Sequence, residues 1–189
     1  MATDTWFRTI FVLLITVITI TQFAYRRARP KTKTELLITD RSVFVIPLWI
    51  ASITLYPCKF GWFEYTIPLA HWLRVIGAFG LFACIPLSIW IYRELGVNFS
   101  PKLEIVTNQE LVCSGPYRFV RHPMYATLIA CVLSATLLSA NLIVGVTSAL
   151  VAIAMAYRTR KEDAMLLLRF TERYRQYMNR TNALVPRWR

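Results

Sequence analysis

Apolar residues fall into long runs along this chain, separated by short polar stretches rich in arginine and lysine. One run covers about Trp6 to Tyr25 and another about Leu69 to Tyr92, and each is long enough for a helix that crosses the hydrocarbon core of a bilayer. A shorter run between them, about Ser42 to Pro57, contains Pro47, which predicts a kinked span. The pattern is typical of a polytopic membrane protein.

Two further apolar runs, about Pro123 to Ser139 and about Leu142 to Tyr157, lie close together in the sequence. Only a residue or two, around Ala140 and Asn141, joins them, which predicts a tight antiparallel helical hairpin. Beyond the second run, the segment from Glu162 to Met178 continues without Gly or Pro and keeps a helical apolar spacing. We expect it to form a basic amphipathic helix at the membrane surface.

The composition agrees with this interpretation. Of the 189 residues, 56% are hydrophobic, and the mean hydropathy is +0.45, which is too apolar for an ordinary soluble domain. We therefore predict an all-α polytopic protein with about five transmembrane helices. Residues 1–92 would hold the first three helices. Residues 93–189 would form a catalytic half, with a cytosolic loop, the last two membrane helices and the C-terminal helix.

The basic residues predict an orientation in the membrane. The net charge is +12, and nineteen of the twenty-two Lys and Arg residues fall in the segments on one side, the exceptions being Arg8, Lys59 and Arg74. The positive-inside rule then puts the N-terminus outside and the C-terminus in the cytosol. The partner of this charge is the bilayer with its anionic lipids, and not a nucleic acid. Arg74, near the outer end of its run, is expected to snorkel to the headgroups.

The cysteines carry no recognisable metal or disulfide pattern. Cys58, Cys84, Cys113 and Cys131 have no C-x-x-C spacing, and three of them lie within or beside apolar runs. We interpret them as small core residues.

The polar loop before the fourth apolar run, Gly115 to Tyr125, is the main candidate for chemistry. It reads GPYRFVRHPMY, and Pro123 is suited to the first position of the helix that follows. Arg118, Arg121 and His122 therefore come just before a helix N-terminus, whose unpaired N–H groups add a positive partial charge. Such a site suits a ligand with a carboxylate or phosphate.

The predicted hairpin brings a second stretch to this loop, because it places His122 and Tyr125 near Arg158 and Glu162. The rings of Tyr117 and Tyr125 offer faces for an adenine or a cationic centre, and an arginine offers a fork for a carboxylate. Glu162 offers an acceptor for an ammonium group or a ribose diol. The set suits S-adenosylmethionine, and the sequence has no glycine-rich dinucleotide motif, Walker motif or H-E-x-x-H motif.

A series of residues in the C-terminal half carries a resemblance to a known family. The series comprises Leu95-Gly96, Asn98-Phe99-Ser100, Leu111-Val112, the loop Gly115 to Tyr125, Arg158, Glu162-Asp163, Phe170, Tyr174, Tyr177 and Val185-Pro186. In this order the residues resemble the isoprenylcysteine carboxyl methyltransferase family of integral membrane enzymes. The resemblance implies methyl transfer from S-adenosylmethionine at a site between the cytosol and the bilayer.

The resemblance also implies roles for individual residues. The expected cofactor contacts are Val112, Gly115, Tyr117, His122, Pro123, Tyr125, Arg158 and Glu162, together with Gln109, whose position often carries His in the family. We expect Arg121, His122 and Glu162 closest to the chemistry, with no metal among the expected ligands. Arg93 and Asn98 either orient the acceptor or shape the turn, and Tyr174 is also assigned to the acceptor.

Three classes of function stay open at this point. The first is a membrane methyltransferase acting on an amphiphilic or prenylated acceptor, chiefly a prenylcysteine-like carboxylate, with a phospholipid or a small thiol as competing acceptors. A carboxylate needs no base, whereas an amine or hydroxyl would need His122 or Glu162. The second is an NADPH-dependent reductase of sterols or polyprenyl chains, in which Asn usually stands at the position of Met124, so this methionine favours methyl transfer. The third is a non-catalytic membrane protein that binds lipid.

Overall fold

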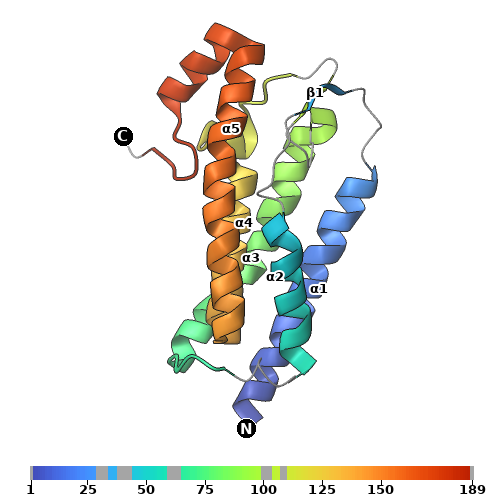
Figure 1. The fold of residues 1–189 in the computed structure, drawn as a ribbon, viewed down its shortest axis with the longest axis vertical. Helices are drawn as coiled ribbons and strands as arrows, with labels where there is room; N and C mark the ends of the chain where they lie inside the picture. The colour runs from blue at the N-terminus through green and yellow to red at the C-terminus, as the bar shows by residue number, and fades with distance from the viewer. Residues whose placement is uncertain are drawn as a thin grey trace.

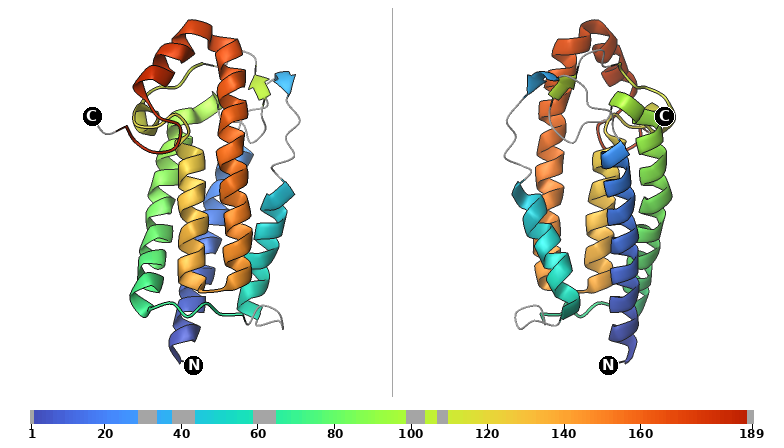
Figure 2. Two further views of the ribbon diagram at one scale, coloured as in Figure 1. Left: turned by 60° about the vertical axis from the view of Figure 1, so that its left-hand side comes forward. Right: turned by 90° about the vertical axis from the view of Figure 1, so that its right-hand side faces the viewer.

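The computed structural model describes residues 2–28, 34–37, 44–58, 65–98, 104–106 and 110–187. Over these residues the α-helices are α1 (Ala2–Ala28), α2 (Val45–Leu55), α3 (His71–Leu95), α4 (Pro123–Ser139) and α5 (Leu142–Arg180). Short 3₁₀ turns are η2 (Tyr56–Cys58), η4 (Gly96–Asn98) and η5 (Gly115–Arg118). The α-helices run lengthwise as one bundle, and the N-terminus lies at the end opposite the C-terminal part of α5 (Figures 1 and 2).

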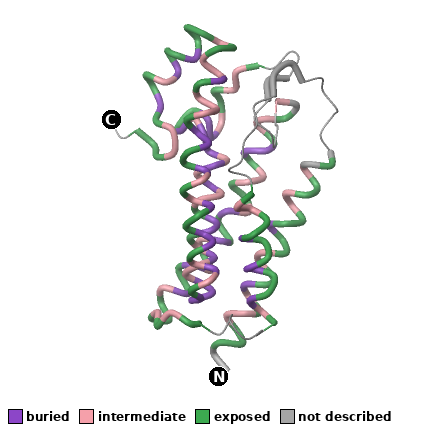
Figure 3. The backbone as a smooth tube through the Cα atoms, in the orientation of Figure 1, coloured by how far each residue is buried: buried purple, intermediate pink, exposed green. Residues whose placement is uncertain are grey.

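The helices identify an integral membrane protein. Among the described residues, Asp4–Tyr25, His71–Leu95 and Leu142–Arg180 are long and apolar enough to cross a membrane, and the apolar helices Val45–Cys58 and Pro123–Ser139 are shorter. Large apolar side chains cover the outside of the bundle, while the buried positions lie where helices face one another (Figure 3). The first charged residue of α5 is Arg158, so the hydrocarbon-compatible part of α5 ends just before it.

The boundaries of α4 and the start of α5 follow from the chemistry of their end residues. Pro123 takes the first turn of α4, and Ala140, in the left-handed conformation with φ 50° and ψ 38°, ends it after Ser139. Asn141 then caps α5, because its side-chain oxygen accepts the backbone N–H groups of residues 143 and 144. The two caps reverse the chain within two residues, and α4 and α5 lie side by side.

Small residues bring α3 and α4 close together. A Cβ atom on Gly77 would lie 2.6 Å from the backbone nitrogen of Leu138, and one on Gly80 would overlap the side chain of Ser134. Such close backbone approach is how helices associate in lipid, where there is little hydrophobic gain from pairing them. On the other side of the bundle, Trp49 Nε1 of α2 donates a 2.9 Å hydrogen bond to Ser148 Oγ of α5.

Arg74 does not snorkel, and that prediction was wrong. The residue is 6% exposed, its Nη1 lies 2.6 Å from Asp4 Oδ1, and its Nε donates to the carbonyl of Leu138 at 3.1 Å. Its guanidinium also lies 4.0 Å from the centre of the Phe7 ring. Because α1 supplies both a carboxylate and an aromatic face, the cation is stabilised inside the bundle.

The fold is all-α as predicted, except for a small two-stranded ribbon at the end of the bundle that carries the C-terminal part of α5. Here β1 (Thr34–Leu37) pairs with β2 (Glu104–Val106) in antiparallel fashion. The ribbon links the segment after α1 to the loop before α4.

A bend at Thr171 divides α5, whereas we predicted an uninterrupted helix up to Met178. Thr171 has φ 45° and ψ −112°, a conformation that is strained for a residue other than glycine. Beyond it the helix turns back toward the loop that precedes α4 (Figure 2). The bend could not be predicted from the sequence, because neither Gly nor Pro lies at this position.

Candidate active site

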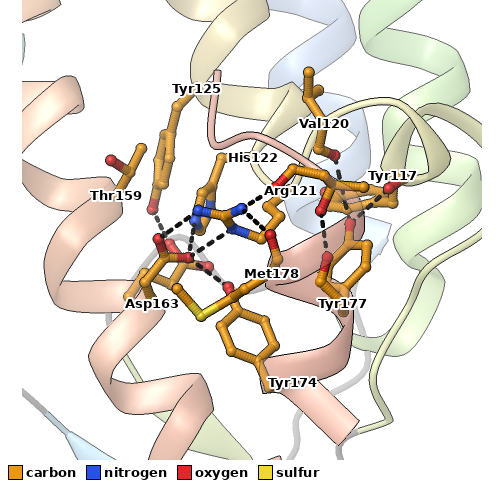
Figure 4. Close-up of polar contacts among 12 residues, drawn as sticks. Tyr117, Val120, Arg121, His122, Tyr125, Thr159, Asp163, Tyr174, Tyr177 and Met178 are labelled. Carbon is orange, nitrogen blue, oxygen red and sulfur yellow. Dashed lines mark hydrogen bonds and ion pairs between the residues drawn. The ribbon is translucent and has the colours of Figure 1, made fainter. Parts of the chain in front are cut away.

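The C-terminal tail holds the loop that precedes α4. The backbone N–H groups of Arg121 and His122 donate to the carbonyls of Asn182 and Ala183, both at 2.9 Å. These bonds continue the parallel bridge between Val120 and Asn182. Because the loop backbone is fixed on this side, the side chains of Arg121 and His122 are directed toward α5 (Figure 4).

Asp163 of α5 is the centre of the polar network in Figure 4. His122 Nε2 lies 2.7 Å from its Oδ1, Arg121 Nη2 lies 3.2 Å from its Oδ2, and the Tyr174 hydroxyl donates to Oδ1 at 2.5 Å. Burial by itself raises the pKa of Asp163, but the hydrogen bonds from His122, Tyr174 and Arg121 outweigh it and lower the pKa to about 2. The side chain is therefore a carboxylate at any physiological pH.

Arg121 also closes the end of α5. Its Nη1 donates to the carbonyl of Met178 at 3.3 Å and to the carbonyl of Thr181, while Nε and Nη2 face Asp163. One side chain thus satisfies two carbonyls at a helix C-terminus, where a cation is also favoured by the helix dipole. Most of the guanidinium is engaged within the protein.

A second hydrogen-bonded chain joins α4 to α5. The Tyr125 hydroxyl donates to Glu162 Oε2 at 2.5 Å and accepts from Arg158 Nε at 2.8 Å. The His122 ring stacks on the Tyr125 ring, with centroids 5.6 Å apart and an interplanar angle of 26°. The ring of Tyr125 is therefore fixed at its face and at its hydroxyl.

Tyr177, beyond the bend in α5, reaches back to the loop. Its hydroxyl donates to the carbonyl of Tyr117 at 2.6 Å. Tyr117 is itself buried, and burial followed by the nearby charge of Glu162 raises the pKa of its phenol well above the ordinary value. Tyr117 therefore stays neutral and can donate a hydrogen bond.

Two adjoining cavities flank Tyr125. A polar one of about 620 Å³ lies at the end of the bundle, and its lining includes Tyr117, His122 and Glu162. An apolar one of about 750 Å³ lies between the helices, and residues of α1 to α5 line it. Met124 and Tyr125, in the first turn of α4, line both and so form the partition between them.

Most of the predicted site residues line the polar cavity. They are Val112, Tyr117, Arg121, His122, Tyr125 and Glu162 from the loop and helices, with Asn98 and Tyr174 from the predicted acceptor set. Asn98 also shapes its turn, because its side-chain oxygen accepts the backbone N–H of Glu110 at 2.9 Å.

The other predicted site residues lie elsewhere. Arg158 lines the apolar cavity, and Arg93 is exposed at the end of α3 and lines neither cavity. Gly115, with φ +55°, begins the turn η5, and Pro123 is buried at the start of α4; neither is part of the lining. Gln109 lies outside the described residues. Within those residues, no group of three or more His, Cys, Asp or Glu side chains could hold a metal ion.

Sequence reasoning missed the part played by Asp163. This residue does not line the polar cavity, yet it contacts Arg121, His122 and Tyr174, which do. It follows Glu162 directly, and neighbouring residues on an α-helix point about 100° apart. Two adjacent acidic residues on a helix can thus contact different neighbours, and the partners of Asp163 become visible only in the packed structure.

These observations define a polytopic membrane protein with a polar cavity and an apolar cavity that share one wall. Residues 76–168, just under half of the chain, match the sequence model of the isoprenylcysteine carboxyl methyltransferase (ICMT) family, and over these residues the chain is similar to that family. The match runs from α3 through the loop and α4 to Asp163 and beyond in α5. The chain is also similar to "Uncharacterized protein YpbQ" of Bacillus subtilis (strain 168), at 32% identity over 105 residues. That similarity covers 52% of this chain and 58% of the length of the Bacillus protein.

Proposed function

We propose that this chain is an integral membrane methyltransferase that moves a methyl group from S-adenosylmethionine to a lipophilic or amphiphilic acceptor. The observation that carries the proposal is the shared wall, Met124 and Tyr125, between a polar and an apolar cavity. A water-soluble donor on one side and a lipophilic acceptor on the other would meet at these two side chains. The match of residues 76–168 to the ICMT family model supports the class of reaction.

The residues of the polar cavity fit this cofactor. Glu110 and Glu162 offer carboxylates for an ammonium group or ribose hydroxyls, and Tyr117 and Phe170 offer aromatic surface for an adenine. When bound, the cofactor supplies an electrophilic methyl group on a positively charged sulfur.

The chain itself would contribute alignment and exclusion of water. Arg158 and Glu162 hold the Tyr125 hydroxyl from two sides, which keeps the partition in one position. The apolar cavity would take the hydrocarbon part of the acceptor, with Ile91, Leu128 and Met155 in its wall.

An anionic acceptor group suits this arrangement best. Arg158 is 3% exposed and lines the apolar cavity, so its positive charge would attract a carboxylate carried by a lipophilic chain. A prenylcysteine-like carboxylate is therefore our first candidate, and it needs no base. For a hydroxyl or amine acceptor, Glu162 and His122 are the candidate bases. Glu162 Oε2 accepts from the Tyr125 hydroxyl, and His122 Nε2 lies against Asp163.

Cofactor binding is the first test. Purified protein in detergent should bind S-adenosylmethionine saturably, and S-adenosylhomocysteine but not NADPH should displace it. Glu162→Gln should weaken binding by about 10-fold to 100-fold, the worth of one hydrogen bond to a charged group. Arg173→Ala is the matched control, because Arg173 is exposed and does not line the cavity. Displacement by NADPH would instead indicate a reductase, and binding of neither ligand would indicate a lipid-binding protein.

The acceptor needs its own assay. Transfer of a radiolabelled methyl group into a farnesylated cysteine with a free carboxylate should exceed transfer into phospholipids or an alkyl thiol. Transfer should be abolished when that carboxylate is blocked as an ester. Faster labelling of a phospholipid or of the thiol would move the assignment to that acceptor.

We further propose five membrane spans, with the N-terminus outside and the polar cavity facing the cytosol. The charge asymmetry of the chain supports this. The polar cavity is lined by the loop before α4 and the C-terminal part of α5, which lie at the bundle end away from the N-terminus (Figure 1). Two exposed cysteines provide the test, because Cys58 ends η2 and Cys113 precedes η5. A membrane-impermeant maleimide should label Cys58 on intact cells and Cys113 only on inverted vesicles. The reverse labelling would invert the proposed topology.

A further inference from the structure

The antiparallel register of α3 and α4 brings two cysteines together. Gly77 faces Leu138 and Gly80 faces Ser134, where small residues let the two backbones approach closely. Continuing the same register by about one turn sets Cys84 of α3 opposite Cys131 of α4.

The side-chain contacts agree with this register. Cys84 Sγ of α3 donates to the carbonyl of Thr127 of α4 at 3.8 Å, and Thr127 lies one helical turn before Cys131. Both cysteines are free thiols, 4% and 3% exposed, and both line the apolar cavity. Neither takes part in the polar network around Asp163. A reduced dithiol therefore forms part of the wall of a cavity inside the bundle.

We propose that Cys84 and Cys131 are an oxidation site, at which a lipid-soluble quinone converts the dithiol to an intramolecular disulfide. The two thiols together give up two protons and two electrons, and one S–S bond forms. The quinone takes up both protons and both electrons and becomes the hydroquinone. A quinone suits the site because apolar side chains of membrane helices surround the thiols, whereas a charged oxidant such as glutathione disulfide would have to leave water.

The disulfide would change the cavity in which the thiols lie. The two sulfur atoms would move to about 2.05 Å, and the hydrogen bond from Cys84 to the Thr127 carbonyl would be lost. Cys84, Thr127 and Cys131 all belong to the cavity wall. An effect on methyl transfer rests on our placing the acceptor in this cavity, but formation of the bond does not.

Counting thiols tests the bond without any activity assay. The full chain in lipid nanodiscs is treated with a fully substituted benzoquinone, which cannot add to thiols, then denatured and alkylated. Alkylated thiols should fall from four to two, and peptide mapping should find Cys84 joined to Cys131. Glutathione disulfide should leave this pair reduced. The proposal would be overturned if all four thiols were still alkylated after quinone treatment, or if Cys58 and Cys113 were the two that could no longer be alkylated.

Single-cysteine variants test whether these two residues form the disulfide. Reduction of the disulfide then tests whether the bond lowers methyl transfer. Cys84→Ala and Cys131→Ala should each keep three alkylatable thiols with or without quinone. In the wild-type chain, oxidation should leave S-adenosylmethionine binding unchanged while lowering transfer to a lipophilic acceptor, and dithiothreitol should restore it. Unchanged transfer in a fully oxidised sample would refute the regulatory role. If no transfer occurs even in the reduced chain, the proposed function fails, and the thiol count still decides whether the disulfide forms.

Discussion

Replacing Asp163 by asparagine tests whether the polar network holds the site together. Asn keeps the shape of the side chain and can still accept from the Tyr174 hydroxyl, but it removes the charge that faces Arg121 and His122. Arg121 is only 10% exposed in its side chain, so its guanidinium would be left partly buried without a carboxylate. We therefore expect a clear loss of stability, although the substitution only replaces one carboxylate oxygen by an amide nitrogen.

The pKa of Asp163 sets the size of the expected loss. The native pKa of about 2, against an ordinary value of 3.8, corresponds to roughly 2.5 kcal/mol at about 1.4 kcal/mol per pKa unit. The side chain is 15% exposed, and solvent screening reduces the figure to about 2 kcal/mol. Because the native pKa is lowered, this contribution is complete above the ordinary pKa of 3.8 and is lost as the pH falls toward about 2.

Denaturant unfolding in detergent or bicelles measures this loss. Asp163→Asn should lower the free energy of unfolding by about 2 kcal/mol at pH 7, and the gap to wild type should narrow below about pH 4. Glu162→Gln is the matched control on the neighbouring residue, since Glu162 lines the cavity and should affect ligand binding more than stability. Equal stability of Asp163→Asn and wild type at pH 7, or a larger loss in Glu162→Gln, would refute the reasoning.

Four further substitutions test the packing of the helices and the turn before α4. Gly77→Ala should cost about 1 to 3 kcal/mol in unfolding free energy, because its Cβ meets backbone atoms, whereas Gly80→Ala should cost less since a serine side chain can move. Gly115→Ala should lower the thermal midpoint by an amount equivalent to about 1 to 2 kcal/mol, because φ is +55°; an unchanged midpoint would argue against this turn. Asp4→Asn should cost about 1 to 3 kcal/mol in denaturant unfolding, because Arg74 stays buried without its carboxylate; no loss would mean that the pair contributes nothing.

The helices and the loop before α4 could be predicted because single residues mark them. Pro123 marks the start of α4, and Asn141 supplies the side chain that caps α5 after a two-residue connection. The short connection in turn requires the loop and the charged part of α5 to lie at the same end. That is why the meeting of Tyr125 with Glu162 could be expected from the sequence.

The errors have a different physical origin, because they concern which neighbour a side chain meets. Arg74 was expected to snorkel to the headgroups, but it is buried and pairs with Asp4 of α1, whose side chain is 58% exposed. The bend at Thr171 depends on tertiary contacts of Tyr174 and Tyr177 that outweigh a local strain of about 1 to 3 kcal/mol. The spacing of apolar residues identifies which face of a helix is buried. It does not identify the side chains that pack against that face.

The first turn of α4 explains why so much of the inferred chemistry falls in one short segment. His122 ends the polar loop, Pro123 begins the helix, and Met124 and Tyr125 stand at the boundary between the two cavities. Successive residues on a helix turn by about 100°, so a single turn can face the polar cavity, the bundle interior and the neighbouring helix at once. Asp163 anchors this turn from α5 without entering the cavity. The side chains in the partition are thereby held in place and remain available to contact ligands on both sides.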